Sequence, residues 1–432
     1  MIPLLGKPVS NATRGPEIER SVSRTTAALL TVCLCVMMAV PAALEVFVNP
    51  QPGLIPLFRQ DLKTFGFQLT LQEVEKHLVY ASQFASAVRQ PYQRFLVAWF
   101  GQGSRTVVVG KDGYLFHRTH LLNTSGPGIR SDGFLRPPRT GPDIVDVVIK
   151  RVLGRGRADR SENAGRDRNS SFADSLTVLT AFHHALERRG VHLVLVGVPN
   201  KLTVYPERLR PEYPVSEGPA WNADYPEWRR RLVQEGVDYV DLTEPFWEQK
   251  DRGEAPLFLP LDTHWSPRGV AVAAQIVADR VRGYLGPYPP LEVSSRVETI
   301  VEPADLIALL GLRRAGPLFP EGRLQLTEVV PDAAVPTGDA APVLLFGDSL
   351  SGYYDLNESS GLGQRGGFAW QLMLELKTGV QRFVGFGQTL PLVIQETFDT
   401  HPNLLTHKRV VVMEFHIGQL AAKTFSFRFS VP

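Results

Sequence analysis

The chain has 432 residues, of which 44% are hydrophobic and 21% are charged, as is typical of globular proteins with a sizeable core in one or two domains. Its formal net charge of +2 gives no indication of nucleic-acid binding. Both cysteines, Cys33 and Cys35, lie in an N-terminal apolar segment. The rest of the chain therefore has no disulfide, no cysteine metal site and no thiol nucleophile.

The N-terminal region has the pattern of a membrane anchor. Residues 1–24 are polar and carry several basic side chains, and residues 25–48 form an apolar run close to the ~20 residues that span a bilayer. Because basic residues mark the cytoplasmic side, we expect a cytoplasmic leader, a transmembrane helix in a bacterial inner membrane and a body that faces the periplasm. A signal peptide cleaved near residues 40–42 and a buried core helix are the alternatives.

The segments that follow are predicted to lead into the main domain. Residues 49–102 have the pattern of a helical stalk or cap. Two short apolar segments, 106–109 and 113–116, predict a strand pair that turns between them. Residues 123–170 are rich in Gly, Pro and Arg, which is typical of a mobile insertion. Attraction of their arginines to an acidic polymer is the alternative interpretation.

Helices and strands alternate from residue 172 onward. Near-continuous apolar strands separated by helices indicate a parallel sheet covered on both faces. We therefore predict an α/β fold with a three-layer, mostly parallel sheet, in a domain over residues 103–432. The predicted strands are 192–196, 237–242, 343–346, 381–386 and 409–415; the predicted helices are 173–189, 225–235, 267–284, 367–377 (closed by Gly379) and 390–398; residues 286–340 are read as a variable connection.

An acid and an imidazole lie two residues apart in the loop before the 267–284 helix. Ser266 is a good N-cap and Pro267 suits the first helical position, so Asp262 and His264 belong to the loop that enters this helix. A histidine here can accept a proton while a carboxylate holds its tautomer. Taken alone, the pair is more often part of a surface loop.

A candidate nucleophile follows the predicted strand 343–346. The sequence Gly347-Asp348-Ser349-Leu350 is a glycine turn with a serine at its tip. Ser349, His264 and Asp262 each lie at a strand end or helix start. Together they fit the Ser/His/Asp arrangement of a hydrolase or an acyltransferase.

These residues resemble a known family. Gly347-Asp348-Ser349-Leu350 is similar to the nucleophile block of SGNH (GDSL-type) hydrolases, in which the companion Asp and His follow the serine. Here they precede it as D-T-H-W, an order that resembles the alginate O-acetyltransferase family of AlgJ and AlgX. The segments 111–116 (KDGYLF), 199–201 (PNK) and 367–369 (GFA) agree with this family, so the resemblance extends over about 103–418.

The resemblance implies a fold of the SGNH-hydrolase type and acetyl transfer to hydroxyls of an alginate-like exopolysaccharide. Ser349 would carry the acetyl group, His264 would act as the base and Asp262 would orient it. A membrane-bound O-acyltransferase would deliver acetyl, and no cofactor is expected. Two rivals remain open. One is an acetyl-esterase with the same three residues, and the other is a non-catalytic polysaccharide-assembly subunit.

One departure from the SGNH pattern concerns the oxyanion hole. The G-x-N-D block that supplies an asparagine donor in SGNH enzymes is absent from the sequence. We expect the Ser349 backbone N–H and groups near Gly387 and Gln388 to replace it, and a poor hole would slow the enzyme by ~10²–10³-fold per missing donor.

Three further residues have a functional and a plain interpretation. Lys201 either positions a substrate or is a solvated loop residue. Trp265 either stacks on a sugar or is buried over the three candidate catalytic residues, and Tyr353 either lines the acceptor site or packs in the core. No cluster of histidines or carboxylates has a spacing that predicts a metal site.

Overall fold

The computed structural model describes residues 28–29, 31–32, 83–125, 175–253, 255–312, 316–355, 362–387 and 390–422. The chain divides into two units, 1–92 and 93–432. Within the described residues, no helix is long and apolar enough to cross a membrane. Most of the predicted anchor, residues 25–48, lies outside the described residues, as does most of the predicted stalk.

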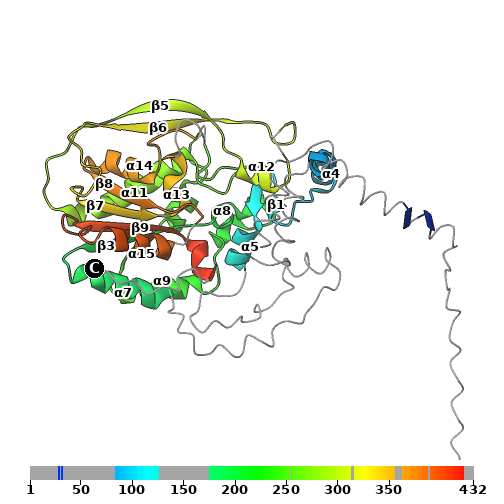
Figure 1. Cartoon of the computed structure of the whole chain (residues 1–432). Coiled ribbons are helices and arrows are strands. Elements are labelled where there is room, and N and C mark those ends of the chain that lie inside the picture. The colour runs from blue at the N-terminus through cyan, green and yellow to red at the C-terminus, as the bar shows by residue number, and fades with distance from the viewer. Residues whose placement is uncertain are drawn as a thin grey trace, which may run out of the picture. The chain divides into compact units, whose positions relative to one another are not determined.

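The second unit is built on a five-stranded sheet with the strand order β4-β3-β9-β7-β8 (Figure 1). Every pairing within this sheet is parallel. The strands are β3 (His192–Val198), β4 (Asp238–Asp241), β7 (Val343–Gly347), β8 (Val380–Val384) and β9 (Val410–His416). The predicted parallel α/β sheet is confirmed.

Both faces of the sheet are buried, which explains the continuous apolar strands. In β7, Val343 and Leu345 belong to one core cluster and Leu344 and Phe346 to the other. The helices α11 (Pro267–Leu285) and α14 (Phe368–Leu376) cover the first face, whereas α7 (Ser175–Glu187), α9 (Tyr225–Gln234) and α15 (Leu390–Thr400) cover the second (Figure 1). The result is a three-layer sandwich.

Helix α14 ends at Leu376, one residue before the predicted end at 377. The chain leaves α14 at Lys377, which has a left-handed φ of 54° and whose N–H donates to the Met373 carbonyl. Gly379 lies beyond this cap and packs closely on the backbone of Pro336, which leaves no room for a side chain. A non-glycine left-handed residue was not predictable from the sequence, because glycine is the usual residue at this position.

The prediction of a variable connection over 286–340 was wrong. This stretch contains the antiparallel strands β5 (Val293–Val301) and β6 (Arg323–Pro331), with α12 (Asp305–Leu309) between them. Most of β5 is exposed and many of its residues are polar, so the sequence contains no apolar run here that would predict a strand. Ile300, Leu326 and Val329 bury the other side of the pair, and Gln371 of α14 donates a hydrogen bond to the Thr327 carbonyl at 2.7 Å. The hairpin thus forms a flap over the α11–α14 layer (Figure 1).

The remaining elements are a short strand pair and several helices and turns. β1 (Val107–Val109) and β2 (Leu115–His117) form the predicted antiparallel pair. The start of the predicted insertion, residues 123–125, is the end of α5 (Arg118–Ser125), and residues 126–170 lie outside the described residues. The other helices are α4 (Gln83–Phe100), α8 (Lys201–Val204), α10 (Thr243–Gln249) and α13 (Ser349–Gly352), with short 3-10 turns at η1 (Pro206–Arg208), η2 (Val215–Glu217), η3 (Tyr353–Asp355) and η5 (Ile417–Ala422).

Candidate active site

The candidate nucleophile lies where β7 ends and α13 begins. Gly347 closes the strand, and a side chain there would meet the Ser351 hydroxyl at 2.3 Å, so only glycine fits this turn. Asp348 caps α13 by accepting a hydrogen bond from the Leu350 N–H at 2.8 Å. The glycine turn and the hydrogen bond from Leu350 to Asp348 fix the backbone around Ser349 and present its hydroxyl at the carboxyl edge of the sheet.

The loop before α11 brings His264 to the same edge. Its Nε2 lies 3.2 Å from the Ser349 Oγ, and its Nδ1 lies 2.7 Å from the Asp262 Oδ1. Because Asp262 accepts the hydrogen on Nδ1, we assign the tautomer that leaves Nε2 free to accept from Ser349. The three residues therefore form one hydrogen-bonded run, although two of them are far from the serine in sequence.

Asp262 is held as a buried anion. Its Oδ1 also accepts from the His264 backbone N–H at 3.0 Å, and its Oδ2 accepts from the Asp305 N–H at 2.8 Å and the Tyr353 hydroxyl at 2.6 Å. Burial by itself raises the pKa of Asp262. The hydrogen bonds and charge of His264, together with the Tyr353 hydroxyl, more than offset that effect and hold the pKa below its usual range.

Tyr353 supports both members of this pair. Its ring stacks on the His264 imidazole with centroids 3.6 Å apart and planes 9° apart, while its hydroxyl bonds to Asp262. Burial and the neighbouring charge of Asp262 raise the pKa of Tyr353, which keeps the hydroxyl a donor. Of the two sequence interpretations, core packing describes its position, with a polar contact to the candidate site that the sequence did not predict.

Lys201 is not the solvated loop residue of one sequence interpretation. Its side chain is 1% exposed, and Nζ donates to the carbonyls of Leu259, Pro260 and Asp262 at 2.8–3.0 Å. Burial lowers its pKa to about 7, against the opposing charges of Asp262, Asp305 and Glu302. Lys201 thus binds the backbone of the loop that carries Asp262 and His264.

Trp265 is fully buried and does not lie where a sugar could stack on it. Its indole N–H donates to the Leu350 carbonyl at 2.9 Å, and its own carbonyl accepts from the Tyr354 hydroxyl at 2.8 Å. The burial interpretation is therefore correct. Trp265 thus joins the loop that carries His264 to the helix that begins at Ser349, and this contact holds the side chains of His264 and Ser349 in position.

Asp305 is a site residue that the sequence reasoning missed. Its carboxylate accepts from the Thr263 backbone N–H at 2.9 Å and from the Thr263 hydroxyl, and its Oδ2 lies 3.9 Å from the His264 Nδ1. Burial and the charge of Asp262 raise the pKa of Asp305. No motif marks this aspartate, since it begins a short helix in the stretch read as a variable connection.

The glycine-rich turn after β8 is placed only in part. The Gly385 N–H already donates to the Gly347 carbonyl at 3.0 Å, so it is not available to an oxyanion. Gly387 is exposed with a left-handed φ of 71°, whereas Gln388 lies outside the described residues. The proposed contribution of Gly387 and Gln388 to the oxyanion hole stays a prediction.

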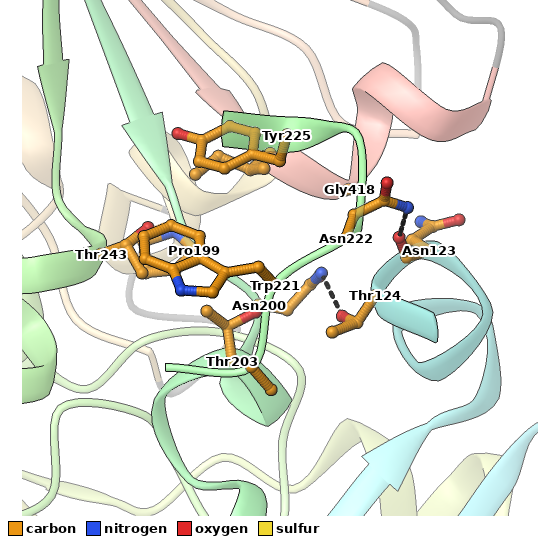
Figure 2. A pocket seen from close by; sticks show the side chains of 12 residues that line it. Asn123, Thr124, Pro199, Asn200, Thr203, Trp221, Asn222, Tyr225, Thr243 and Gly418 are labelled. Carbon is orange, nitrogen blue, oxygen red and sulfur yellow. Dashed lines mark hydrogen bonds between the residues drawn. The ribbon is translucent and has the colours of Figure 1, made fainter. Parts of the chain in front are cut away.

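A separate pocket opens at the carboxyl ends of β3 and β4 (Figure 2). Trp221, stacked on Tyr225, forms one wall, and hydrogen bonds from Asn200 to Thr124 and from Asn222 to the Asn123 carbonyl brace the other. Its volume is about 20 Å³, enough for about one water molecule and too small for a sugar. None of the three candidate catalytic side chains lines it.

Two groups in the described residues bring three potential metal ligands within 4.8 Å of one another. One is Asp262, His264 and Asp305, and the other is His183, His184 and Glu187 on the surface of α7. Neither was predicted from spacing. In the first group the His264 Nδ1 carries the hydrogen that Asp262 accepts, so in this tautomer that nitrogen has no free lone pair for a metal.

Comparison with known proteins gives consistent similarities. The model of a family described as SGNH hydrolase-like domain, acetyltransferase AlgX, matches residues 158–416. The probable alginate O-acetylase AlgJ of Pseudomonas syringae pv. tomato is 30% identical over 277 residues, which are 61% of this chain and 67% of that protein. The Pseudomonas aeruginosa protein of the same name is 30% identical over 261 residues, 58% of this chain and 54% of that protein. The solved O-acetyltransferase domain of Pseudomonas putida AlgJ is 25% identical, covers 73% of this chain and 91% of its own, and has a TM-score of 0.49.

Proposed function

The chain belongs to the family of SGNH hydrolase-like acetyltransferase domains that includes AlgX, and from this premise we propose that it acetylates hydroxyl groups of an alginate-like exopolysaccharide through an acetyl-Ser349 intermediate. The family predicted from the D-T-H-W and G-D-S-L motifs is confirmed. Alginate is the polymer named for the relatives, and it enters here as the proposed acceptor.

The first half-reaction loads the serine. His264 Nε2 takes the Ser349 hydroxyl proton while Oγ forms a bond to the acetyl carbonyl carbon of the donor. The resulting tetrahedral oxyanion accepts a hydrogen bond from the Ser349 backbone N–H. As the intermediate collapses, the bond to the donor oxygen breaks and His264 returns the proton to that leaving group. Asp262 stabilises the imidazolium that forms in between.

The second half-reaction transfers the acetyl group. His264 Nε2 takes a proton from an acceptor hydroxyl, whose oxygen attacks the acetyl-Ser349 carbonyl. Collapse breaks the Ser349 ester bond, and His264 returns the proton to Oγ. The observation that carries this proposal is the hydrogen-bonded run from Ser349 through His264 to Asp262, with Nε2 directed at the hydroxyl.

Hydrolysis is the competing second step, because water can attack the same ester. The distinguishing experiment incubates the protein with a small activated acetyl ester, with and without an oligouronate. A transferase releases the donor's leaving group faster when the oligouronate is present and places O-acetyl groups on the sugar, as read by mass spectrometry. Equal rates and an unmodified sugar would favour the esterase, and no release above that of Ser349→Ala would favour the non-catalytic subunit.

We place this chemistry on the periplasmic side of the inner membrane. The basic leader and the apolar run of residues 25–48 support an anchor, and α4 exposes a group of touching aromatic side chains, Phe95, Trp99 and Phe100, at 49%, 76% and 66%. Exposed aromatic residues of this type are enriched at membrane interfaces. Acetyl groups made in the cytoplasm would then have to cross the bilayer, which is the role of a membrane-bound O-acyltransferase partner.

A reporter fusion tests this topology. An enzyme that works only outside the cytoplasm, joined after the apolar run, is expected to be active and to stay with the membrane fraction. Activity only of a cytoplasmic reporter would contradict the proposed location, and a shortened soluble product would identify a cleaved signal instead.

A further inference from the structure

Three histidines from separate elements converge beside the candidate nucleophile. His117 ends β2, His120 lies in α5 and His416 ends β9. The ring centroids of His117 and His120 are 5.4 Å apart, and those of His120 and His416 are 4.5 Å apart. All three residues are half-buried. The mechanism described above uses none of them.

The histidine cluster is joined to the turn that carries Ser349. The His416 backbone N–H donates to the Asp348 Oδ2 at 3.2 Å, one residue before the serine. His264 is close enough for its charge to lower the pKa of both His120 and His416, after the larger effect of burial. His416 thus ends the strand next to β7, at the carboxyl edge that also holds Ser349, and the rings of His120 and His117 adjoin it there.

The ring nitrogens of the cluster are available to a ligand. The Thr119 N–H donates to the His117 Nδ1 at 3.3 Å, which leaves the hydrogen of the neutral ring on Nε2. In the described part of the chain, the rings of His120 and His416 make no hydrogen bond to another side chain or to the backbone. Their spacing does not place them among the groups of metal-ligand geometry.

The groups that act electrostatically on the rings of His120 and His416 are all bases. Lys201 of α8 and His264 lie close enough to His120 for positive charge on them to lower its pKa, and His264 and His117 have the same effect on His416. The Asp348 carboxylate, which accepts from the His416 backbone N–H, also accepts from the Leu350 N–H and the Gln419 amide. Within the described residues, none of the three imidazoles makes an ion pair with a carboxylate, so an acidic ligand would meet no competing anion on the rings.

We propose that His117, His120 and His416 form a subsite that binds the carboxylate of a uronic-acid residue in the acceptor polymer, next to the residue that Ser349 acetylates. The inference rests on the proposed function, because it assigns this subsite to the same acceptor. Neighbouring strands of a sheet lie about 4.8 Å apart, so a site one strand from β7 is within reach of an adjoining sugar.

The subsite has a defined dependence on pH. Burial lowers the pKa of all three imidazoles, and that of His416 falls to about 4, so the empty cluster is neutral at pH 7. A bound carboxylate favours the charged imidazole and raises its pKa. Binding an oligouronate therefore takes up a proton, and affinity increases as the pH falls from 7.5 to 6.

The test is a calorimetric titration of the full chain carrying Ser349→Ala with a short oligouronate, in buffers of different ionisation enthalpy. We expect proton uptake on binding and tighter binding at pH 6. His120→Gln and His416→Gln should each weaken binding about tenfold and abolish the uptake, as expected for the loss of a charge-assisted contact. His192→Gln, at the opposite edge of the sheet, should leave both unchanged.

A neutral oligosaccharide with its carboxylates reduced to alcohols serves as the second probe. Its affinity should not respond to His120→Gln or His416→Gln, and equal losses for both probes would overturn the subsite. Oligouronate binding without proton uptake, in a protein whose wild type does acetylate Ser349, would refute the subsite alone. Uptake that depends on the histidines, in a wild type that never acetylates Ser349, would support the subsite and refute the proposed function.

Discussion

At the scale of single residues, the Tyr353 hydroxyl is the contact whose contribution can be isolated most cleanly. Tyr353→Phe keeps the ring stacked on His264 and removes the bond to Asp262. A hydrogen bond to a charged group contributes about 1.5–3 kcal/mol, so we expect a loss of unfolding free energy of that size at pH 7, measured by urea denaturation. Acetylation of Ser349 should slow because Asp262 holds His264 less firmly.

The sign of the pH dependence follows from Asp262. Its pKa is depressed in the folded protein, so its contribution to stability is present above its unfolded pKa and disappears as the pH falls through its folded pKa. The cost of Tyr353→Phe should therefore shrink below about pH 4. Tyr354→Phe is the matched control, because its hydroxyl bonds to the neutral Trp265 carbonyl. A cost for Tyr353→Phe that does not change with pH would contradict this assignment.

Lys201 offers a second residue-scale prediction. Lys201→Met leaves the carbonyls of Leu259, Pro260 and Asp262 without their donor, and each buried unsatisfied group costs about 1–3 kcal/mol. Because these carbonyls belong to the loop of His264, the rate of Ser349 acetylation should fall at least tenfold as well.

A second buried lysine provides the control for that change. Lys408 also donates from Nζ to backbone carbonyls, those of Gly338, Asp339 and Ala341, away from the candidate site. Lys408→Met should destabilise the protein to a similar extent without a specific loss of acetylation rate in protein that remains folded. Equal rate losses in both variants would show that Lys201 acts only through global stability.

At the scale of elements, α11 is positioned by a close approach at its first turn. A side chain at Gly269 would meet the Leu257 carbonyl at 2.3 Å, whereas one at Gly283, in the same helix, has nothing within 4 Å. Gly269→Ala should lower the free energy of unfolding by about 1–3 kcal/mol and displace the loop that carries His264. Gly283→Ala should raise the free energy of unfolding by about 0.5–1 kcal/mol, because alanine has a higher helix propensity than glycine. If both substitutions stabilised the protein, the close packing of α11 would be refuted.

At the scale of the whole molecule, the parallel sheet was predictable because its strands are buried on both faces. Continuous apolar runs such as 343–346 show directly in the sequence. The β5–β6 hairpin was not predictable, since most of β5 faces solvent and its polar residues resemble a loop. The same stretch contains Asp305, so the missed hairpin and the missed site residue have one cause.

In the candidate site, too, only the residues marked by local sequence patterns were predictable. The proximity of Ser349, His264 and Asp262 was predictable because capping residues and glycine turns mark strand ends, where a parallel sheet gathers functional groups. Lys201 and Tyr353 were ambiguous because their roles depend on contacts between distant segments, which no local pattern encodes. The histidine cluster was missed for the same reason, as its members come from three separate elements.

Ser349 is proposed to carry the acetyl group, and mass spectrometry of the acid-trapped enzyme detects such an ester directly. After brief incubation with an activated acetyl ester, wild type should contain one acetyl group on the peptide with Ser349. Ser349→Ala and His264→Ala should contain none, and Ser351→Ala, which loses only its bond to Glu414, should still be labelled at Ser349. An acetyl group on another residue instead of Ser349, or equal release of acetyl by wild type and Ser349→Ala, would refute the acetyl-Ser349 intermediate.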